Sequence, residues 1–422
     1  MAVATQSVTE LCRAAKAAAR ALATLDSGTK DRALLAVADA LEARMPEILE
    51  ANARDLKAGR ESGLSEALMD RLALTEERVG GMARGVREIV ALPDPVGEVI
   101  DGYRLPNGLD VRKVRVPLGV VAVVYEARPN VTIDAAALCL KSGNAILLRG
   151  SSSATHSNAV LAAIAGEAAE SAGLPAGALA LVAGGGREEL AELAGQEGLV
   201  DLIIPRGGEG LKKALSAVAK VPVIYAASGN CHVYVDASAD LSRAVEIVVN
   251  AKTQRPGTCN SAETLLVHVD AAAAFLPGAL RALAGAGVEL RGCERTRALA
   301  PDDVAVGEAT DEDYATEFLA LVLAVRVVDS VEEAVEHVGV FGSGHSEAIL
   351  TGSTAAARAF QLGVDAACVY VNASTRFTDG GEFGMGAEIG NSTQKLHARG
   401  PIGLRELCTF KYLVEGDGHL RA

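Results

Sequence analysis

The chain has 422 residues, and a typical domain size of roughly 150 residues predicts two or three domains. Hydrophobic residues make up 50% of it, charged residues 22%, and the mean hydropathy is +0.23, which excludes a disordered chain. The net charge is −14 and aromatic residues are only 3%, so neither nucleic acid nor an anionic membrane is expected as a partner. These values still allow a local basic pocket for a small anion.

The spacing of the cysteines and the length of the apolar runs indicate the cellular compartment of the protein. No apolar run approaches the roughly 18–20 residues of a membrane span. The N-terminus mixes charged residues with alanines and favours an amphipathic helix over a signal peptide. The seven cysteines include no CxxC pair, so neither a disulfide framework nor a metal site is expected. The sequence therefore predicts a cytoplasmic protein.

Residues 1–98 carry helical periodicity, with apolar positions recurring at i, i+3, i+4 and i+7 until Pro93, Pro95 and Gly97 end the pattern. Residues 99–116 then alternate as two strands around Pro106-Asn107-Gly108, because Asn-Gly favours a tight hairpin turn. This hairpin fits either a subunit contact or a plain surface ribbon.

From residue 117, short Val/Ile-rich runs alternate with Ala-rich helical stretches, which is typical of βαβ units and a parallel sheet. The alternation runs to residue 230, its last apolar run being 221–227, and begins again at 231. We therefore expect two α/β domains with a boundary near Ser228-Gly229-Asn230. Residues 374–399 are rich in Gly, Thr and charges and are too long for a connector, so we expect an ordered functional loop there. A last strand is expected over Leu407–Val414.

Several common active-site motifs are absent from the sequence. It contains no GxGxxG, GxxxxGK[ST], HExxH or GxSxG. A kinase-type phosphate loop, a zinc hydrolase and a serine hydrolase therefore lose support.

The segment QRPGTCNSAETLLV, residues 254–267, is the strongest candidate site. Cys259 lies in a polar, glycine-containing loop, where backbone N–H groups can lower a thiol pKa and receive an oxyanion. A loop cysteine without a role is the alternative, because cysteine is often only a small buried hydrophobe. Among the other cysteines, Cys231, beside His232 at the start of a strand, is the only rival.

Two further turns follow predicted strands. In YEARPNVTID, Asn130 would point into the crevice at the carboxyl end of a parallel strand, where its amide could help Cys259 hold an oxyanion. In IIPRGGEGLKKAL, the turn 206–208 precedes a helix whose first N–H groups suit a dinucleotide pyrophosphate. The plain alternatives are an ordinary Asn turn and a glycine-rich turn common in such folds.

Together and in order, these stretches resemble one family. The segments VYEARPN, LKSGNAILLRG, IPRGG, NAKTQRPGTCNSAETLLV and VYVNASTRFTDGGEFGMGAEIGNSTQKLHARGP are similar to those of glutamate-5-semialdehyde dehydrogenases, also called γ-glutamyl phosphate reductases, in the aldehyde dehydrogenase superfamily. The resemblance implies an α/β fold with two doubly wound domains and a small β oligomerisation element. It implies a cofactor-binding domain (1–98 and 117–230), a catalytic domain (231–399, with the active-site loop 374–399), and an oligomerisation hairpin with a C-terminal strand (99–116 and 400–422).

The resemblance also implies roles for single residues. Cys259 matches the catalytic nucleophile, and Asn130 matches the asparagine of the oxyanion hole. The implied cofactor is NADP(H), and the residues that match its binding site are Arg149, Pro205, Arg206, Gly207, Gly208, Glu317 and Phe318. The phosphate and α-carboxylate of the substrate call for bidentate donors, for which the candidates are Arg128, Arg255 and Arg376, with His397 as a weaker one.

The implied reaction is the NADPH-dependent reduction of L-glutamyl 5-phosphate to L-glutamate 5-semialdehyde and phosphate through a cysteine thioester, the second step of proline biosynthesis. Hydrolytic superfamily members carry a glutamate base in an ELGG-like segment, whereas the corresponding VIYAASGNCHVYVD has no acid before Asp236. That absence agrees with acyl-phosphate chemistry. The resemblance further implies a homodimer or homotetramer and leaves room for a transient contact with glutamate 5-kinase.

Two other functions stay open at this point. One is a hydrolytic aldehyde dehydrogenase for another substrate, which would carry an acid near residue 224. The other is a non-enzymatic scaffold that binds the kinase, which would not need Cys259 or Asn130.

Overall fold

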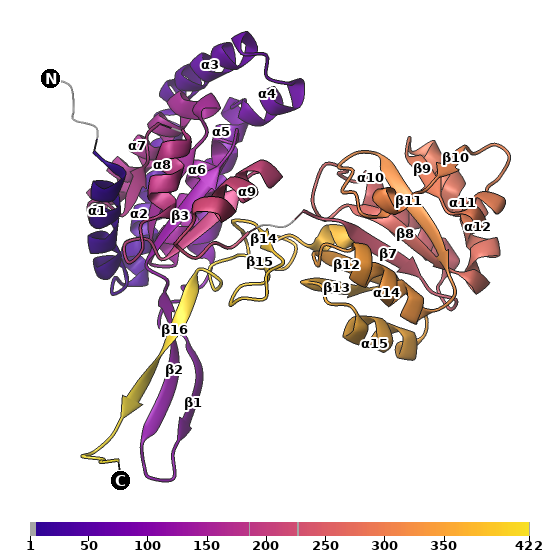
Figure 1. Cartoon of the computed structure of the whole chain (residues 1–422). Coiled ribbons are helices and arrows are strands. Elements are labelled where there is room, and N and C mark those ends of the chain that lie inside the picture. The colour runs from indigo at the N-terminus through magenta and orange to yellow at the C-terminus, as the bar shows by residue number, and fades with distance from the viewer. Residues whose placement is uncertain (1–5, 185, 226–227, 422) are drawn as a thin grey trace. The chain divides into compact units, whose positions relative to one another are not determined.

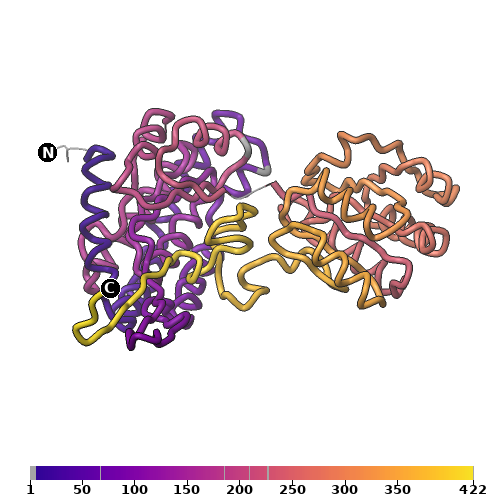
Figure 2. Tube along the Cα trace, turned by 60° about the horizontal axis from the view of Figure 1, so that its bottom comes forward, coloured from indigo at the N-terminus to yellow at the C-terminus, as the bar shows by residue number. Residues whose placement is uncertain are grey.

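The structure is a computed structural model that describes residues 6–184, 186–225 and 228–421. These residues divide into two compact units (Figure 1). Unit 1 comprises the chain up to Tyr225, Gly384–Gly390 and the chain from Ile402 on. Unit 2 comprises the intervening chain up to Phe383 and Asn391–Pro401. The chain thus returns to unit 1 before it ends, as the yellow trace in Figure 2 shows.

The first helices of unit 1 follow the predicted periodicity. They are α1 (Val8–Leu22), α2 (Ser27–Ala43), α3 (Met45–Glu61), α4 (Glu66–Leu72) and α5 (Glu76–Ala91). Ser7 starts α1 with a capping box: its Oγ accepts from the Glu10 N–H at 3.3 Å, and the Glu10 carboxylate accepts from the Ser7 N–H at 2.9 Å. After α5, the buried Lys30 of α2 contacts Asp94 at 2.5 Å, which holds the proline-containing turn against the helices.

A parallel sheet in the order β5-β4-β3-β6 forms the centre of unit 1. Its strands are β3 (Val120–Tyr125), β4 (Ala145–Gly150), β5 (Leu179–Leu181) and β6 (Leu202–Arg206), and the connecting elements are α6 (Asn130–Lys141), η1 (Ser152–Ala154), α7 (Thr155–Ser171), α8 (Arg187–Ala194) and α9 (Glu209–Val218). β3 and β4 are buried along their whole length, as expected for a sheet covered on both faces. The expected strand at 221–227 contributes, in its described part, an isolated bridge between Ile203 and Val223, because Pro222 has no N–H for a ladder. Residues 226–227 lie outside the described residues.

The predicted hairpin is confirmed and gains a third strand. β1 (Val99–Arg104), β2 (Asp110–Pro117) and β16 (Cys408–Glu415) form an antiparallel sheet that extends away from the helices of unit 1 (Figure 1). Gly108 adopts a φ of +96° in the turn, where a glycine is favoured. The ribbon exposes the large apolar side chains of Val99, Ile100, Tyr103, Phe410, Tyr412 and Val414.

The main sheet of unit 2 is parallel throughout its described part, in the order β10-β9-β11-β8-β7-β12-β13. Its strands are β7 (Cys231–Val235), β8 (Ala262–His268), β9 (Glu289–Gly292), β10 (Val306–Glu308), β11 (Val322–Val328), β12 (Ser346–Leu350) and β13 (Cys368–Val371). The helices are α10 (Leu241–Thr253), α11 (Val269–Gly285), α12 (Glu294–Ala298), α13 (Asp311–Tyr314), α14 (Val331–Phe341), α15 (Thr354–Gly363) and η2 (Thr375–Phe377), and β14 (Asn391–Ser392) pairs with β15 (Gly400–Pro401). The predicted α/β class is confirmed in both units.

Within the described residues, no helix is long and apolar enough to cross a membrane.

Asn144 joins three parts of unit 1 at its centre. The side chain is fully buried; its Oδ1 accepts from the Gly119 N–H at 2.8 Å, and its Nδ2 donates to the Leu407 carbonyl at 2.8 Å. It therefore ties the start of β4 to the residue before β3 and to the residue before β16.

We expect Asn144→Ala to lower the free energy of unfolding by about 1–3 kcal/mol, because the Gly119 N–H loses its acceptor and the buried Leu407 carbonyl keeps only the longer bond from the Leu118 N–H, at 3.4 Å. Urea denaturation followed by circular dichroism measures this loss. Asn250→Ala, at an exposed position of α10, is the control. Equal stability of the two variants would contradict the linking role of Asn144.

Candidate active site

Cys259 lies in unit 2, in the loop between α10 and β8. The strands of this sheet are parallel, so the segments that precede β7, β11 and β12 reach the same edge as the Cys259 loop. Those segments carry Gly229, Glu317 and His345. The site thus forms at the amino edge of the sheet, whereas open α/β sheets generally bind ligands at the carboxyl edge.

Gly229 packs directly against the backbone of Cys259. A Cβ atom at position 229 would lie 1.4 Å from the Cys259 carbonyl oxygen, so a glycine is required for this approach. The Gly229 N–H donates to Oε1 of Glu317 at 2.6 Å. Gly229 therefore links the backbone of Cys259, the candidate nucleophile, to the carboxylate of Glu317, the predicted cofactor contact.

Cys231 lies behind this loop and differs from Cys259 in exposure. Cys231 is fully buried, and its thiol donates to the Cys259 carbonyl at 3.2 Å. Burial raises the pKa of the Cys231 thiol well above its ordinary value. Cys259 is partly exposed. The rival thiol is therefore a poor nucleophile at neutral pH.

The first part of the loop 374–399 is held against the Cys259 loop. Asn260 donates from Nδ2 to the carbonyls of Thr378, at 3.0 Å, and Arg376, at 3.3 Å. Thr375 donates from its hydroxyl to the Asn260 carbonyl at 2.7 Å. Asn260 is buried, so these bonds order the segment beside the candidate nucleophile.

Two of the three predicted substrate arginines lie beside Cys259. Arg376 donates from Nε to Oε1 of Gln254 at 2.8 Å. Burial and the positive charge of Arg255 lower the pKa of Arg376, while the charge of Cys259 opposes this shift. Such a basic neighbourhood favours the thiolate form of a cysteine. The third arginine, Arg128, lies in unit 1.

Glu317 and Phe318, the predicted cofactor contacts, also lie in unit 2. The guanidinium of Arg291 lies over the Phe318 ring, with its Cζ atom 5.3 Å from the ring centre. Leu319 follows with a φ of +53°, a conformation uncommon for a residue other than glycine. The backbone after Glu317 is therefore sharply constrained.

Asn130 is the first residue of α6 in unit 1, and its amide is anchored. Nδ2 donates to the Asp134 carboxylate at 2.9 Å. Burial raises the pKa of Asp134 to about 6, against the opposing effects of this hydrogen bond and the Arg206 charge. Asn130 therefore contacts the Asp134 carboxylate, and the charge of Arg206 acts on the same group, which sequence reasoning missed.

Pro205 and Arg206 end β6, and Gly207 and Gly208 form the predicted turn into α9. The Gly208 N–H, expected to bind a pyrophosphate, donates to the Glu126 carboxylate at 3.1 Å. A Cβ atom at Gly207 would lie 2.7 Å from the carboxyl carbon of Glu126. An anion bound at this N–H therefore has to displace Glu126.

Arg149 is the next-to-last residue of β4, and its side chain is buried. It donates from Nη2 to the Gly186 carbonyl at 2.5 Å, while its Nε has no hydrogen-bond partner among the described residues. Burial lowers its pKa, and Glu189 opposes this shift. A buried guanidinium with an unused N–H fits the binding of an anionic or hydroxyl-bearing ligand group.

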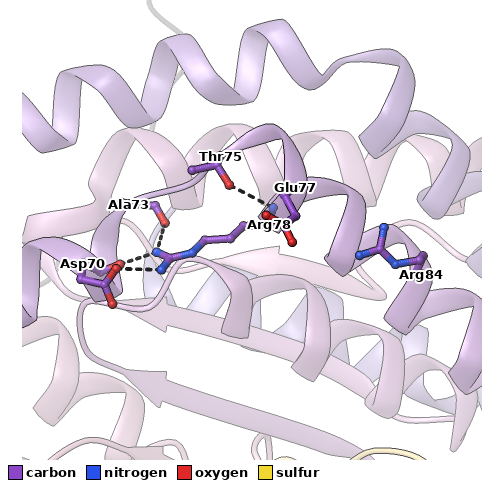
Figure 3. A pocket seen from close by; sticks show the side chains of 6 residues that line it. All are labelled: Asp70, Ala73, Thr75, Glu77, Arg78 and Arg84. Carbon is purple, nitrogen blue, oxygen red and sulfur yellow. Dashed lines mark hydrogen bonds and ion pairs between the residues drawn. The ribbon is translucent and has the colours of Figure 1, made fainter.

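Two surface hollows offer no comparable chemistry. The hollow in unit 1, about 490 Å³, is lined by Asp70, Ala73, Thr75, Glu77, Arg78 and Arg84 (Figure 3). Arg78 there closes the turn between α4 and α5, since it donates to the Asp70 carboxylate at 2.7 Å and to the Ala73 carbonyl at 2.8 Å. Within the described part of the chain, no group of three His, Cys, Asp or Glu side chains is placed to hold a metal.

The second hollow, in unit 2, includes Cys293 and three arginines. The arginines are each paired with a carboxylate, namely Arg295 with Asp329, Arg297 with Glu308 and Arg326 with Glu333. Burial acts to raise the pKa of Cys293, but hydrogen bonds from Thr296 and the Val327 N–H lower it below its ordinary value. The thiolate form of Cys293 is thus favoured by its hydrogen bonds, while the arginines around it are paired with carboxylates.

Comparison with known proteins identifies the class. The model of the aldehyde dehydrogenase family matches residues 1–290. The chain belongs to the aldehyde dehydrogenase family, as expected.

Individual relatives are more specific. The chain is 57% identical over 414 residues to the γ-glutamyl phosphate reductase of Thermobifida fusca, covering 98% of each chain. It is also 57% identical over 407 residues to that of Moorella thermoacetica, covering 96% of this chain and 97% of the relative. The crystal structure of γ-glutamyl phosphate reductase from Thermotoga maritima matches with a TM-score of 0.96 at 46% identity, covering 99% of this chain and 100% of that one.

We expect Gly229→Ala to lower the turnover of the enzyme about 10²-fold, because the added methyl group displaces the Cys259 carbonyl. Steady-state kinetics measure the loss. Gly257→Ala is the matched control in the same loop, since its nearest atom would lie at 3.8 Å. Similar kinetics of the two variants would contradict the packing described.

Asp134 makes the stability of unit 1 depend on pH. Its folded-state pKa, about 6, lies above its ordinary 3.8, so its stabilising contribution is complete below pH 4 and is lost as the pH rises through 6. In Asp134→Asn, the amide oxygen still accepts from Asn130 and no charge is buried. We expect this variant to gain stability relative to the wild type by on the order of 3 kcal/mol between pH 4 and pH 7.

Urea denaturation at several pH values measures this gain. Asp101→Asn, at an exposed position, is the control. A stability difference between Asp134→Asn and the wild type that does not change with pH would refute the raised pKa.

Proposed function

We propose that the chain is a γ-glutamyl phosphate reductase, which reduces L-glutamyl 5-phosphate to L-glutamate 5-semialdehyde and phosphate, the second step of proline biosynthesis. The observation that carries the proposal is the Cys259 loop, where a partly exposed thiol lies among Arg255, Arg376 and constrained backbone. The relatives at more than half identity support the same activity.

The Cys259 thiolate attacks the acyl carbon of the substrate. The S–C bond forms, the C–O bond to phosphate breaks, and the phosphate leaves with the electron pair of that bond. A nicotinamide cofactor, when bound, would supply the hydride for reduction of the thioester carbon to the aldehyde. Cys259 leaves as the thiolate, ready for the next cycle.

The oxyanion of each tetrahedral state needs preorganised donors. We assign this role to the backbone N–H of Cys259 and to the amide of Asn130. Asp134 accepts one hydrogen of the Asn130 amide, which fixes its orientation and leaves the second hydrogen available.

The substrate carries a phosphate and an α-carboxylate, and guanidinium groups suit both. We propose Arg128, Arg255 and Arg376 as the residues that bind them. Arg376 is held by Gln254, which limits the conformations of its side chain. His397 stays a weaker candidate for the same role.

We propose NADP(H) as the cofactor. Glu317 and Phe318 would contact the nicotinamide ribose, and residues 205–208 would line the path of the pyrophosphate. Arg149 would lie near the adenosine ribose, where a guanidinium accommodates a 2′-phosphate. Its unused Nε supports this assignment.

Hydrolysis of the thioester requires a general base for water. The corresponding stretch before Asp236 contains no acid, which supports phosphate rather than water as the acyl acceptor in the reverse reaction. We therefore prefer this function to a hydrolytic aldehyde dehydrogenase. The presence of Cys259 and Asn130 argues against a non-enzymatic scaffold.

We propose that the ribbon of β1, β2 and β16 forms the subunit contact of a homodimer or homotetramer. Its exposed apolar side chains and unpaired strand edges are features that an interface covers. We also propose that the enzyme is cytoplasmic and that it makes a transient contact with glutamate 5-kinase.

We expect Cys259→Ala to abolish NADP⁺ reduction by glutamate 5-semialdehyde in the presence of phosphate, because no thioester can form. The wild type should lose its steady-state rate when phosphate is omitted. Cys231→Ala is the matched control and should keep at least about a third of the activity, since that buried thiol does not react. Turnover of Cys259→Ala above a few per cent of wild type would refute the nucleophile.

We expect Arg149→Met to raise the KM for NADP⁺ about tenfold or more, because a charged hydrogen bond to the 2′-phosphate is lost. The KM for NAD⁺, which has no 2′-phosphate, should change much less. Equal changes for the two cofactors would contradict the role of Arg149.

A further inference from the structure

A buried ion pair brackets the Cys259 loop. Lys252 lies in the last turn of α10, Glu263 is the second residue of β8, and both side chains are completely buried. Lys252 Nζ contacts Glu263 Oε2 at 2.5 Å. The pair therefore joins the chain before the loop to the chain after it.

The second oxygen of Glu263 reaches another segment. Oε1 accepts from the Leu319 N–H at 3.3 Å. Leu319 has a φ of +53°, which a leucine holds only when its surroundings enforce it. Glu263 is therefore one of the groups that fix the backbone just after Glu317.

These contacts close into a ring at the amino edge of the unit 2 sheet. From the Cys259 loop the ring passes through Glu263 to Leu319, back along the chain to Glu317, through its hydrogen bond to Gly229, and so to the Cys259 carbonyl. A shift at any member of the ring changes the spacing between Cys259 and Glu317.

Stability alone does not account for the pair. Replacing a buried ion pair with apolar side chains of similar volume is often neutral or stabilising. Burial raises the pKa of Glu263 to about 7 and lowers that of Lys252, so both groups carry a desolvation cost. Lys252 also offsets the negative charge of Glu263. Without that offset, the Glu263 carboxylate would be repelled more strongly by the nearby Glu317 carboxylate.

We propose that Glu263 is a positioning residue, which fixes Glu317 relative to Cys259 through the Leu319 N–H and thereby sets the affinity for the nicotinamide cofactor. Lys252 offsets the buried charge of Glu263, and a neutral glutamine at position 263 makes that offset unnecessary. The positioning role rests on the proposed function, in which Cys259 is the nucleophile and Glu317 contacts the cofactor. Neither residue touches the reacting atoms.

The test compares two double variants that both remove the buried charges. Lys252→Met with Glu263→Gln keeps an oxygen for the Leu319 N–H, whereas Lys252→Met with Glu263→Leu does not. We expect the leucine variant to raise the KM for NADP⁺ about tenfold and the glutamine variant to stay within about threefold of wild type. In both variants, kcat should fall less than KM rises.

A control separates positioning from loss of stability. Asp236 accepts from Ser238 at 2.6 Å and from Thr351 at 2.7 Å, at the other end of β7. Asp236→Asn should lower the melting temperature without changing the KM for NADP⁺. If the leucine variant does not fold, Leu319→Gly relaxes the same backbone, and we expect it to raise that KM several-fold.

The outcomes distinguish the two proposals. Wild-type turnover that needs no phosphate, or that survives in Cys259→Ala, overturns the proposed function. Phosphate-dependent wild-type turnover with equal KM values in the glutamine and leucine variants overturns the positioning role alone. An unchanged KM in Leu319→Gly has the same consequence.

Discussion

The close approach of Gly229 to the Cys259 carbonyl is the constraint on which the candidate site depends. It leaves no room for a Cβ atom, and it directs the Gly229 N–H to Glu317. The same carbonyl accepts from the buried Cys231 thiol, so the backbone at Cys259 is held on more than one side. A thiol carried on such a fixed loop can meet an acyl carbon in one orientation, which a covalent mechanism requires.

Electrostatics explain how an acidic chain can work on anionic ligands. The net charge of −14 describes the whole chain, whereas Arg255 and Arg376 concentrate positive charge beside Cys259. Among the described residues, arginines at the surface hollow of unit 2 are neutralised by carboxylates instead. Local pairing, rather than total charge, therefore decides which arginines can bind a phosphate or a carboxylate.

Much of the fold could be predicted from the sequence, because the periodicity of apolar residues reflects which side chains are buried. The continuous run Val120–Tyr125 is a fully buried strand, and Asn107-Gly108 is a hairpin turn. The strands Glu289–Gly292 and Val306–Glu308 were missed because they are short and contain charged residues. The partners of Asn130, Gly229 and Glu263 could not be predicted either, since they depend on contacts between distant segments. Glu263 in particular resembles an ordinary surface glutamate in the sequence, yet it is completely buried.

The central claim is that Cys259 carries the acyl group and passes it to phosphate rather than to water. Mass spectrometry of the enzyme after incubation with glutamate 5-semialdehyde and NADP⁺ tests it directly. Without phosphate, we predict a glutamyl adduct on the tryptic peptide of residues 253–281, which contains Cys259 and not Cys293. Addition of phosphate should remove the adduct. An adduct on another peptide, or one that is lost equally fast without phosphate, would contradict the account.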